Sequence, residues 1–292
     1  MELKPSNLST FAKIIADSIS PTGQRITTFQ LRYQRFFHSE FLTHRVFSRN
    51  ASSSRAIPIS KMIEQVRNDC AMPIHWGKNQ SGMQAKTELE TELRKKAIEH
   101  WVTASQLAAD IAEEMSAIGL HKQVANRILE PFQYIEVVLT ATDFANWFEL
   151  RHHEDAQPEI YELARLMKIA QDESTPRLLQ PGEWHLPYIT DEERLSMPTN
   201  LLLNVSAARC CRVSYLRHDG SAPDIRKDLE LCEMLVGARP LHASPFEHQA
   251  TPDELNPWYS AWLKGKWKSP HQHGNFDGWV QHRKIIESKF YS

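Results

Sequence analysis

The chain has 292 residues, 41% of them hydrophobic, which is enough for a sizeable core in one large domain or two smaller ones. Its 34 Lys and Arg residues nearly balance 36 Asp and Glu residues, so no global field favours nucleic acid or a membrane surface as partner. The start lacks a basic segment followed by an apolar one, and no stretch approaches the roughly 20 apolar residues of a membrane-spanning helix. We therefore expect a cytoplasmic protein.

The first elements predicted along the chain are a strand and a helix. Residues 26–33 alternate between polar and apolar, with β-branched and aromatic side chains, which indicates a half-buried strand. Residues 36–47 are apolar at helical spacing. We expect His44 and Arg45 near the end of that helix and residues 48–55 in the loop beyond it.

Helices dominate the prediction for the middle of the chain. Apolar residues at helical spacing over residues 85–118 predict one long helix, and its apolar stripe is typical of a core or a subunit interface. Two more helices are predicted over 122–139 and 143–170. Prolines then interrupt residues 171–199, which we interpret as a connector or covering loop. A helix at 228–236 and a short strand at 246–250 complete the prediction.

The cysteines predict neither a disulfide framework nor a zinc site. One pair is adjacent and no Cys-x-x-Cys spacing occurs among the four: Cys70, Cys210, Cys211 and Cys232. We expect reduced, buried thiols. The run 152–155 contains only potential metal ligands, but consecutive residues of a helix point about 100° apart, so we predict no metal site there.

The segment 43–55 has the composition of an anion-binding site. It reads THRVFSRNASSSR and contains cations, hydroxyls and an amide, with its principal polar positions at His44, Arg45, Ser48, Asn50, Ser53 and Arg55. Arg guanidinium groups and hydroxyl donors suit phosphate oxygens, and small residues allow close approach of the backbone. The alternative is a solvated loop that follows an apolar helix. The spacing resembles the RHRxxSxNxxSxR motif of the flavin-dependent thymidylate synthases.

Other segments are similar to motifs of the same family, but in a different order along the chain. Residues 207–215 (AARCCRVSY) and 242–248 (HASPFEH) resemble two motifs that precede the RHR motif in ordinary members. Residues 142–160 resemble the family's NxRxLxNFLxLR…AQxEI helix. The resemblance therefore implies one circularly permuted catalytic domain over 1–292, with residues 172–200 as connector or cover and 252–292 as an appended tail. Permutation is tolerated because packed contacts do not depend on chain order.

The resemblance implies a fold and an activity. The expected fold is α+β, a mostly antiparallel sheet flanked by long helices. The expected reaction is C5 methylation of deoxyuridine monophosphate (dUMP) to dTMP, with FAD as cofactor and methylenetetrahydrofolate and NADPH as co-substrates. Family members form homotetramers with active sites between subunits, and the apolar stripe of 85–118 suits that assembly.

Residue roles follow from the same resemblance. FAD is expected to contact or be supported by the residues at the family's flavin positions: His44, Arg45, Ser48, Asn50, Asn146, Ser214, His242, Ser244 and Glu247. The substrate is expected at Glu40, Ser53, Ser54, Arg55, Arg127 and Arg151. Arg151 is the expected catalytic residue, because a fixed cation at the pyrimidine edge stabilises negative charge on the ring. The alternative for Arg151 is a place in a solvated charged face.

Three departures from the family motif leave the substrate open. Thr43 replaces an Arg, Ala51 replaces an acid, and Glu40 replaces a Gln. A carboxyl group near the pyrimidine suits an exocyclic amine, so a dCMP methylase or a hydroxymethylating variant is the alternative. The run 281–284 (QHRK) is rich enough in donors to compensate.

A third hypothesis is single-stranded nucleic-acid binding by the C-terminal tail. Stacking and charge there would come from Trp258, Trp262, Lys264, Lys266, Trp267, Lys268, Trp279 and Arg283. Tryptophans at this density more often pack a tail onto its own domain, which makes nucleic acid the less favoured partner.

Overall fold

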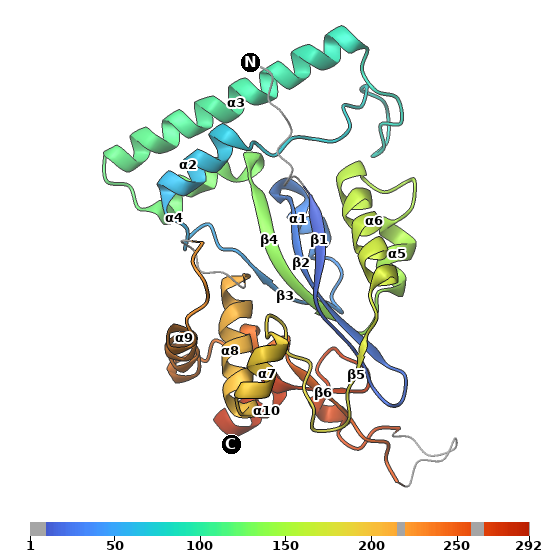
Figure 1. Cartoon of the computed structure of the whole chain (residues 1–292). Coiled ribbons are helices and arrows are strands. Elements are labelled where there is room, and N and C mark those ends of the chain that lie inside the picture. The colour runs from blue at the N-terminus through green and yellow to red at the C-terminus, as the bar shows by residue number, and fades with distance from the viewer. Residues whose placement is uncertain (1–9, 215–219, 258–265, 292) are drawn as a thin grey trace.

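The computed structural model describes residues 10–214, 220–257 and 266–291. Its centre is a five-stranded sheet in the order β3-β4-β2-β1-β5 (Figure 1). The strands are β1 (Phe11–Ile19), β2 (Arg25–Gln34), β3 (Ser48–Ala51), β4 (Tyr134–Ala141) and β5 (Arg177–Leu178). Every pairing is antiparallel except that of β1 with β5. The predicted α+β class with a mostly antiparallel sheet is confirmed.

The two faces of the sheet follow from the alternation along β2 and β4. Phe29 and Leu139 lie opposite each other and belong to the main hydrophobic core. The neighbouring pair, Thr28 and Thr140, points to the other face, where the hydroxyls are 2.7 Å apart. Side chains alternate between faces along a strand, so one face of the sheet is apolar. The other, called the polar face below, is also buried and carries Ile26 and Val138 beside these threonines.

Helices cover the apolar face and one end of the sheet. The apolar face packs against α5 (Ala145–Arg151) and α6 (Pro158–Glu173). A long helix, α3 (Thr91–Ala117), crosses the upper end in Figure 1 and packs on α2 (Ile59–Asn68). The short elements of that end are η1 (Arg35–Phe37), α1 (His38–Phe41), α4 (Lys122–Ala125) and η2 (Asn126–Phe132).

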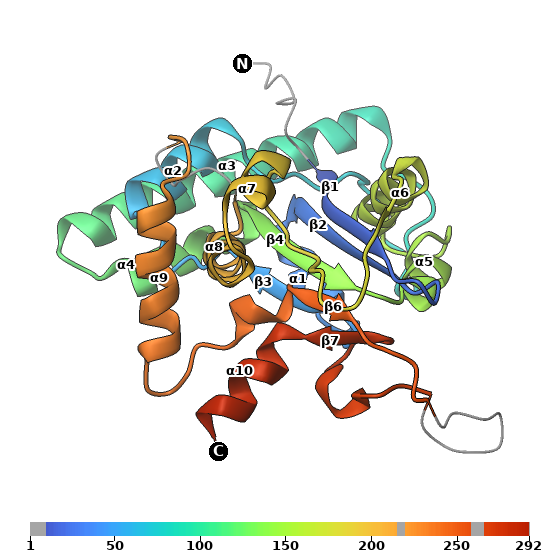
Figure 2. The same cartoon turned by 60° about the horizontal axis from the view of Figure 1, so that its bottom comes forward.

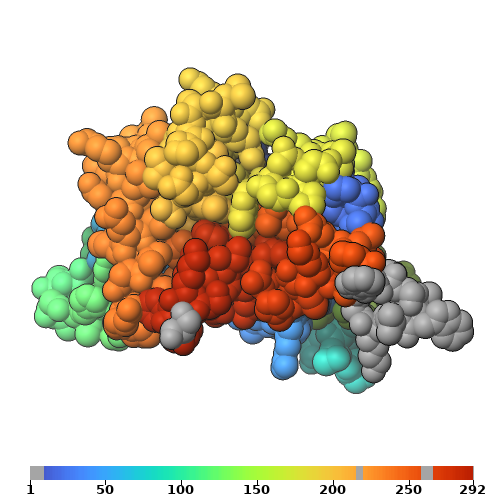
Figure 3. All heavy atoms as spheres, turned by 90° about the horizontal axis from the view of Figure 1, so that it is seen from below, coloured from blue at the N-terminus to red at the C-terminus, as the bar shows by residue number. Residues whose placement is uncertain are grey.

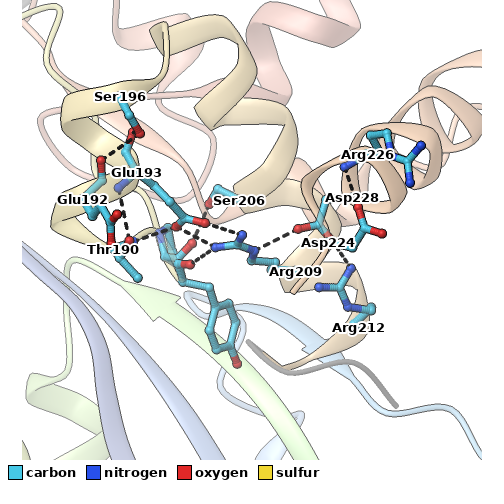
Figure 4. Close-up of polar contacts among 12 residues, drawn as sticks. Thr190, Glu192, Glu193, Ser196, Ser206, Arg209, Arg212, Asp224, Arg226 and Asp228 are labelled. Atoms are coloured by element: carbon cyan, nitrogen blue, oxygen red, sulfur yellow. Dashed lines mark hydrogen bonds and ion pairs between the residues drawn. The ribbon is translucent and has the colours of Figure 1, made fainter. Parts of the chain in front are cut away.

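A buried ion-pair cluster joins the three helices beside the polar face. These are α7 (Asp191–Ser196), α8 (Thr199–Arg212) and α9 (Ile225–Gly237). Arg209 of α8 is fully buried and donates to Asp228 of α9 at 3.0 Å and to Glu193 of α7 at 2.5 and 2.8 Å (Figure 4). Thr190 and Glu193 form a capping box that starts α7. The cluster therefore fixes three helices through one guanidinium group.

The C-terminal segment returns to the sheet. It contains η3 (Ser244–Glu247), β6 (Ala250–Pro252), η4 (Pro270–Gln272), β7 (Trp279–Gln281) and α10 (His282–Phe290). β6 and β7 pair antiparallel and lie below the main sheet (Figure 2). Seen from below, this segment lies between the helical part around α8 and α9 and the β1–β2 hairpin (Figure 3).

Several predicted elements were wrong. Residues 122–139 form α4, η2 and β4 rather than a helix, because 134–141 pairs with both β2 and β3 at the centre of the sheet. The predicted helix at 36–47 ends at Phe41, and 48–51 is strand β3 rather than loop. Residues 246–250 are mostly the short helix η3 and the turn after it, not a strand. Residues 143–170 form two helices, since the chain turns at 152–157 between α5 and α6.

The remaining differences are smaller. The helix predicted at 85–118 begins only at Thr91 as α3, and the helix predicted at 228–236 extends to 225–237 as α9. The buried face of α3 carries Ser105, Ala109 and Ala112, whereas the predicted stripe residue Ile111 is 38% exposed. All four cysteines are free, but only Cys210 and Cys232 are buried, so the expectation of burial was wrong for the other two.

Candidate functional site

The first cluster of predicted site residues lines a hollow between the turn after α1 and helix α5. Its volume is about 210 Å³. Thr43, His44 and Arg45 contribute from the turn. Asn146 and Arg151 contribute from α5, where Asn146 is exposed and Arg151 is half-buried. The structure thus brings together motif residues that are about 100 positions apart in the chain.

His44 and Arg151 are in direct contact in this hollow. Arg151 Nε donates a hydrogen bond of 3.0 Å to His44 Nε2, and Arg151 Nη2 lies 3.4 Å from Thr43 Oγ1. Burial, followed by the positive charges of Arg151 and Arg49, lowers the pKa of His44 to about 4. His44 is therefore a neutral imidazole at pH 7, with Nε2 as the acceptor and the proton on Nδ1.

The position of His44 is set by the core beneath it. Its ring lies edge-to-face on Trp147, with centroids 4.8 Å apart and planes at 87°, and stacks near Phe47. Trp147 is buried, and it also contacts Phe41. Rings packed in this way hold one rotamer, so the Arg151 guanidinium is anchored by a rigid acceptor.

Arg49 is a functional candidate that the motif comparison missed. Its Nη1 donates to the carbonyl oxygens of Phe41 and His44, at 3.3 and 3.1 Å. These two bonds hold the turn that presents Thr43, His44 and Arg45. Arg49 occupies a variable position of the motif, so only its charge within an otherwise small and polar run could have drawn attention to it.

A second cluster lies beyond the other end of β3. Ser54 is buried, and its hydroxyl donates to Glu130 Oε1 at 3.0 Å. Arg127 and Arg35 donate to the same oxygen at 2.8 and 2.9 Å. Of the expected phosphate ligands, the structure thus brings Ser54 and Arg127 together, but around a carboxylate. Glu130 and Arg35 were not predicted.

A third cluster forms where the C-terminal segment meets β3. Gln281 Nε2 donates to Ser48 Oγ at 3.3 Å and to the Glu247 carbonyl at 3.1 Å. Arg283 forms an ion pair with the Glu247 carboxylate. Asn50 Nδ2 lies 3.4 Å from the carbonyl oxygen of Cys210 on α8. Residues 207–214 and 242–248 therefore lie next to the 43–55 motif, although they are far from it in sequence.

Some predicted residues stand alone. Five are exposed at the surface: Glu40, Ser53, Arg55, His242 and Ser244. Ser214 is half-buried at the end of α8, directly before residues that the structure does not describe. The larger hollow, about 510 Å³ between α2 and α3, contains none of the predicted site residues.

The tryptophans of the C-terminal tail that the structure describes are buried. Trp258, Trp262 and Lys264 lie outside the described residues. Trp267 and Trp279 are buried within the protein, which leaves their faces inaccessible to a base. Within 10–214, 220–257 and 266–291, no three His, Cys, Asp or Glu side chains are placed so that they could hold a metal ion, and no helix is long and apolar enough to cross a membrane.

The comparisons with known proteins agree with the motifs. No curated protein matches the chain. The fold is similar to crystal structures of a UMP/dUMP methylase, PolB, from Streptomyces cacaoi. The complex with 5-Br UMP has a TM-score of 0.50 at 16% identity, over 59% of this chain and 92% of PolB. The complex with 5-Br dUMP has a TM-score of 0.49 at 16% identity, over 59% and 93%.

At this identity the likeness to PolB concerns the fold alone. The family assignment comes from the sequence. Residues 14–177, more than half of the chain, match the model of the family described as thymidylate synthase complementing protein. This is the family predicted from the motifs, and the chain belongs to it.

Proposed function

We propose that the protein methylates C5 of a pyrimidine deoxynucleotide, converting dUMP to dTMP. One observation carries the proposal. Arg151, the expected catalytic residue, lies in a hollow lined by the anion motif and is held there by a neutral histidine rather than by a carboxylate. Its positive charge is therefore available to a ligand.

The surroundings of Arg151 suit the chemistry. C5 becomes a nucleophile only when negative charge develops on the pyrimidine ring, and a fixed cation at the ring edge stabilises that charge. His44 accepts a hydrogen bond from Arg151 without neutralising it, because a neutral imidazole carries no charge. Rigid placement of the guanidinium by His44 also avoids reorganisation when the ring charge forms.

The polar groups in and near the hollow suit a flavin cofactor. FAD would supply the hydride for the new methyl group, while methylenetetrahydrofolate provides the carbon and NADPH restores the flavin. Arg45 and Asn146 present exposed polar groups at the hollow, and Ser48, Asn50 and Glu247 lie along β3 and η3. A hollow of about 210 Å³ is smaller than the 300–1,000 Å³ typical of ligand pockets, so the rest of the site must come from elsewhere.

We propose that another subunit completes the site in a homotetramer. The four residues of β3 separate the Arg151 hollow from Ser53, Ser54 and Arg55, and a strand of that length spans roughly 13 Å. Because the two ends of the motif are this far apart, we infer that they belong to two separate half-sites, each facing a different subunit. The exposed apolar residues of α3, Leu93, Leu107 and Ile111, offer a surface for such an assembly.

We also propose that the chain is one permuted catalytic domain. The family match ends at residue 177, but α8 and η3 follow it and pack against β3 and β4. These elements carry the 207–215 and 242–248 segments. The chain order differs from that of ordinary members while the expected neighbours are retained, as permutation requires.

The test is a product analysis. The protein is incubated anaerobically with FAD, NADPH, methylenetetrahydrofolate and an equimolar mixture of dUMP and dCMP, and nucleotide products are weighed by mass spectrometry. We expect a methyl-sized gain on dUMP alone, and a protein that stays yellow through gel filtration. A gain on dCMP, or a hydroxymethyl-sized gain on either nucleotide, would assign the alternative substrate or product. No gain, or no bound flavin, would contradict the proposal.

A further inference from the structure

Three hydrogen-bond donors from three segments of the chain converge on one carboxylate oxygen. Glu130 Oε1 accepts from Arg127 Nη1 at 2.8 Å, from Arg35 Nη2 at 2.9 Å and from Ser54 Oγ at 3.0 Å. Two guanidinium groups and a hydroxyl around a single anionic oxygen are the surroundings that a phosphate oxygen requires. Glu130 thus occupies an anion position that the chain itself has built.

The positive charge of this cluster is half neutralised within the protein. Arg35 and Arg127 contribute two positive charges, and Glu130 removes one of them. A nucleoside monophosphate carries nearly two negative charges at neutral pH. Such a phosphate would therefore meet a repelling carboxylate at the point where the donors converge, unless the carboxylate moves away.

The hydroxyl donor of this cluster is held firmly by the loop that carries it. Asn126 Nδ2 donates to the carbonyl oxygens of Ser54 and Ile57, at 2.6 and 3.1 Å, and Lys122 Nζ donates to that of Ala56 at 2.9 Å. These bonds fix the loop that carries the Ser54 hydroxyl, and Ser54 is only 3% exposed. The Glu130 side chain is 26% exposed, so it has a route to solvent. A ligand that enters the cluster therefore meets a fixed Ser54 hydroxyl, whereas the side chains of Glu130 and of Arg127, which is 51% exposed, have room to move.

We propose that Glu130 is a specificity-determining residue that stands in for a substrate phosphate oxygen. The monophosphate binds here only by displacing the carboxylate, so the chain binds phosphate more weakly than it would without Glu130. For the same reason it discriminates less between nucleotide and nucleoside than it would without Glu130. This inference rests on the proposed function for the identity of the substrate, but the anion position itself does not.

The test compares phosphate binding by the full-length protein and its Glu130→Gln variant. Inorganic phosphate, dUMP and deoxyuridine are titrated by calorimetry at constant ionic strength. We expect the variant to bind phosphate and dUMP about tenfold more tightly, because a neutral amide no longer repels the anion. Deoxyuridine binding should change by less than about twofold. The gain should disappear in the double variant Glu130→Gln with Arg127→Gln.

Glu162→Gln is the matched control. Glu162 is 30% exposed and pairs with Arg165 on α6, so its replacement changes the net charge equally outside the cluster. It should leave phosphate binding unchanged. Glu130→Asp is the second variant, since it keeps the charge but withdraws it by one methylene group. It should bind phosphate more tightly than the original protein but less tightly than Glu130→Gln. It replaces Glu130→Gln in the test if that variant does not fold.

Three outcomes would overturn the inference: unchanged phosphate affinity in the variants, weaker affinity in the variants, or no phosphate binding by any of the proteins. The first and third would leave Glu130 with a structural role only. The second would mean that Glu130 positions the arginines for the phosphate. Phosphate binding is measured without catalysis, so tighter binding with no methylated product would contradict the proposed function alone. Product formation with unchanged binding would contradict this inference alone.

Discussion

Arg209 and Arg151 each lie in the last turn of a helix, but their surroundings are opposite. Arg209 is fully buried and pairs with carboxylates on both sides, Glu193 and Asp228 (Figure 4). Arg151 is half-buried and bonds to two neutral acceptors, His44 and Thr43. A cation that is neutralised by its own protein serves the fold, whereas a cation held by neutral groups remains available to a ligand.

The strongest test of this comparison removes the neutralised cation. Arg209→Met leaves Asp228 buried with Arg212 as its remaining described partner and removes the link to α7. We expect the free energy of unfolding to fall by about 3–5 kcal/mol, as for a broken buried ion pair. Guanidinium denaturation measures it. Arg165→Met, on an exposed pair of α6, is the control and should cost less than about 0.5 kcal/mol. A similar small cost for both would refute a structural role for Arg209.

The second test removes the available cation. Arg151→Gln should lower kcat by about 100- to 1,000-fold while the protein stays folded, because it loses the charge that stabilises the ring anion. Steady-state kinetics with dUMP measures the change, and a thermal unfolding scan confirms the fold. Arg165→Gln should leave kcat unchanged. Activity of Arg151→Gln within threefold of the original would place Arg151 in a solvated charged face.

The third test uses the neutral histidine. The folded pKa of His44 is about 4, below its ordinary value near 6.5, so the unfolded chain binds the proton first as the pH falls. The stabilisation from neutral His44 is complete above pH 6.5 and is lost progressively from 6.5 to about 4. Denaturation at pH 7.5 and 5.0 should show a larger loss for the original protein than for His44→Gln.

The contributions of the other histidines to this pH dependence cancel when the original protein is compared with His44→Gln. Burial lowers the pKa of His185 and His248 to about 3 in both proteins, with the same sign. In Arg151→Gln, the pKa of His44 should rise, because a neighbouring positive charge is removed. Imidazole resonances in an NMR titration measure it. An unchanged value would show that Arg151 does not act on His44.

The smallest expected effect concerns the support of the motif by the C-terminal segment. Gln281→Leu removes donors to Ser48, Asn275 and the Glu247 carbonyl. We expect a loss of about 0.5–1.5 kcal/mol of unfolding free energy, because the Glu247 carbonyl loses this donor, whereas Ser48 and Asn275 keep the hydrogen bond between their side chains. Chemical denaturation measures it, with Gln84→Leu on an exposed loop as control. Equal stability of both variants would mean that the C-terminal segment contacts the 43–55 motif without stabilising it.

The local pattern determined the family and the class of the fold better than the individual elements. The spacing of His44, Arg45 and Asn50 identified the family, because the chemistry of anion binding restricts residue types in a short stretch. Residues 26–33 alternated and formed β2. Residues 134–141 also formed a strand, but their apolar run has no clear period, since both faces of β4 are buried.

Only the tertiary structure decided how the site is assembled. Nothing in the local sequence shows that Arg151 bonds to His44, that Gln281 reaches Ser48, or that Glu130 pairs with both Arg35 and Arg127. The physical reason is that residue type and spacing set which chemical groups are present, whereas charge balance and pKa depend on neighbours brought together by packing. The sequence by itself therefore determined the family, the anion motif and the sheet strand β2. The fold decided which of its cations are neutralised and which remain free to act.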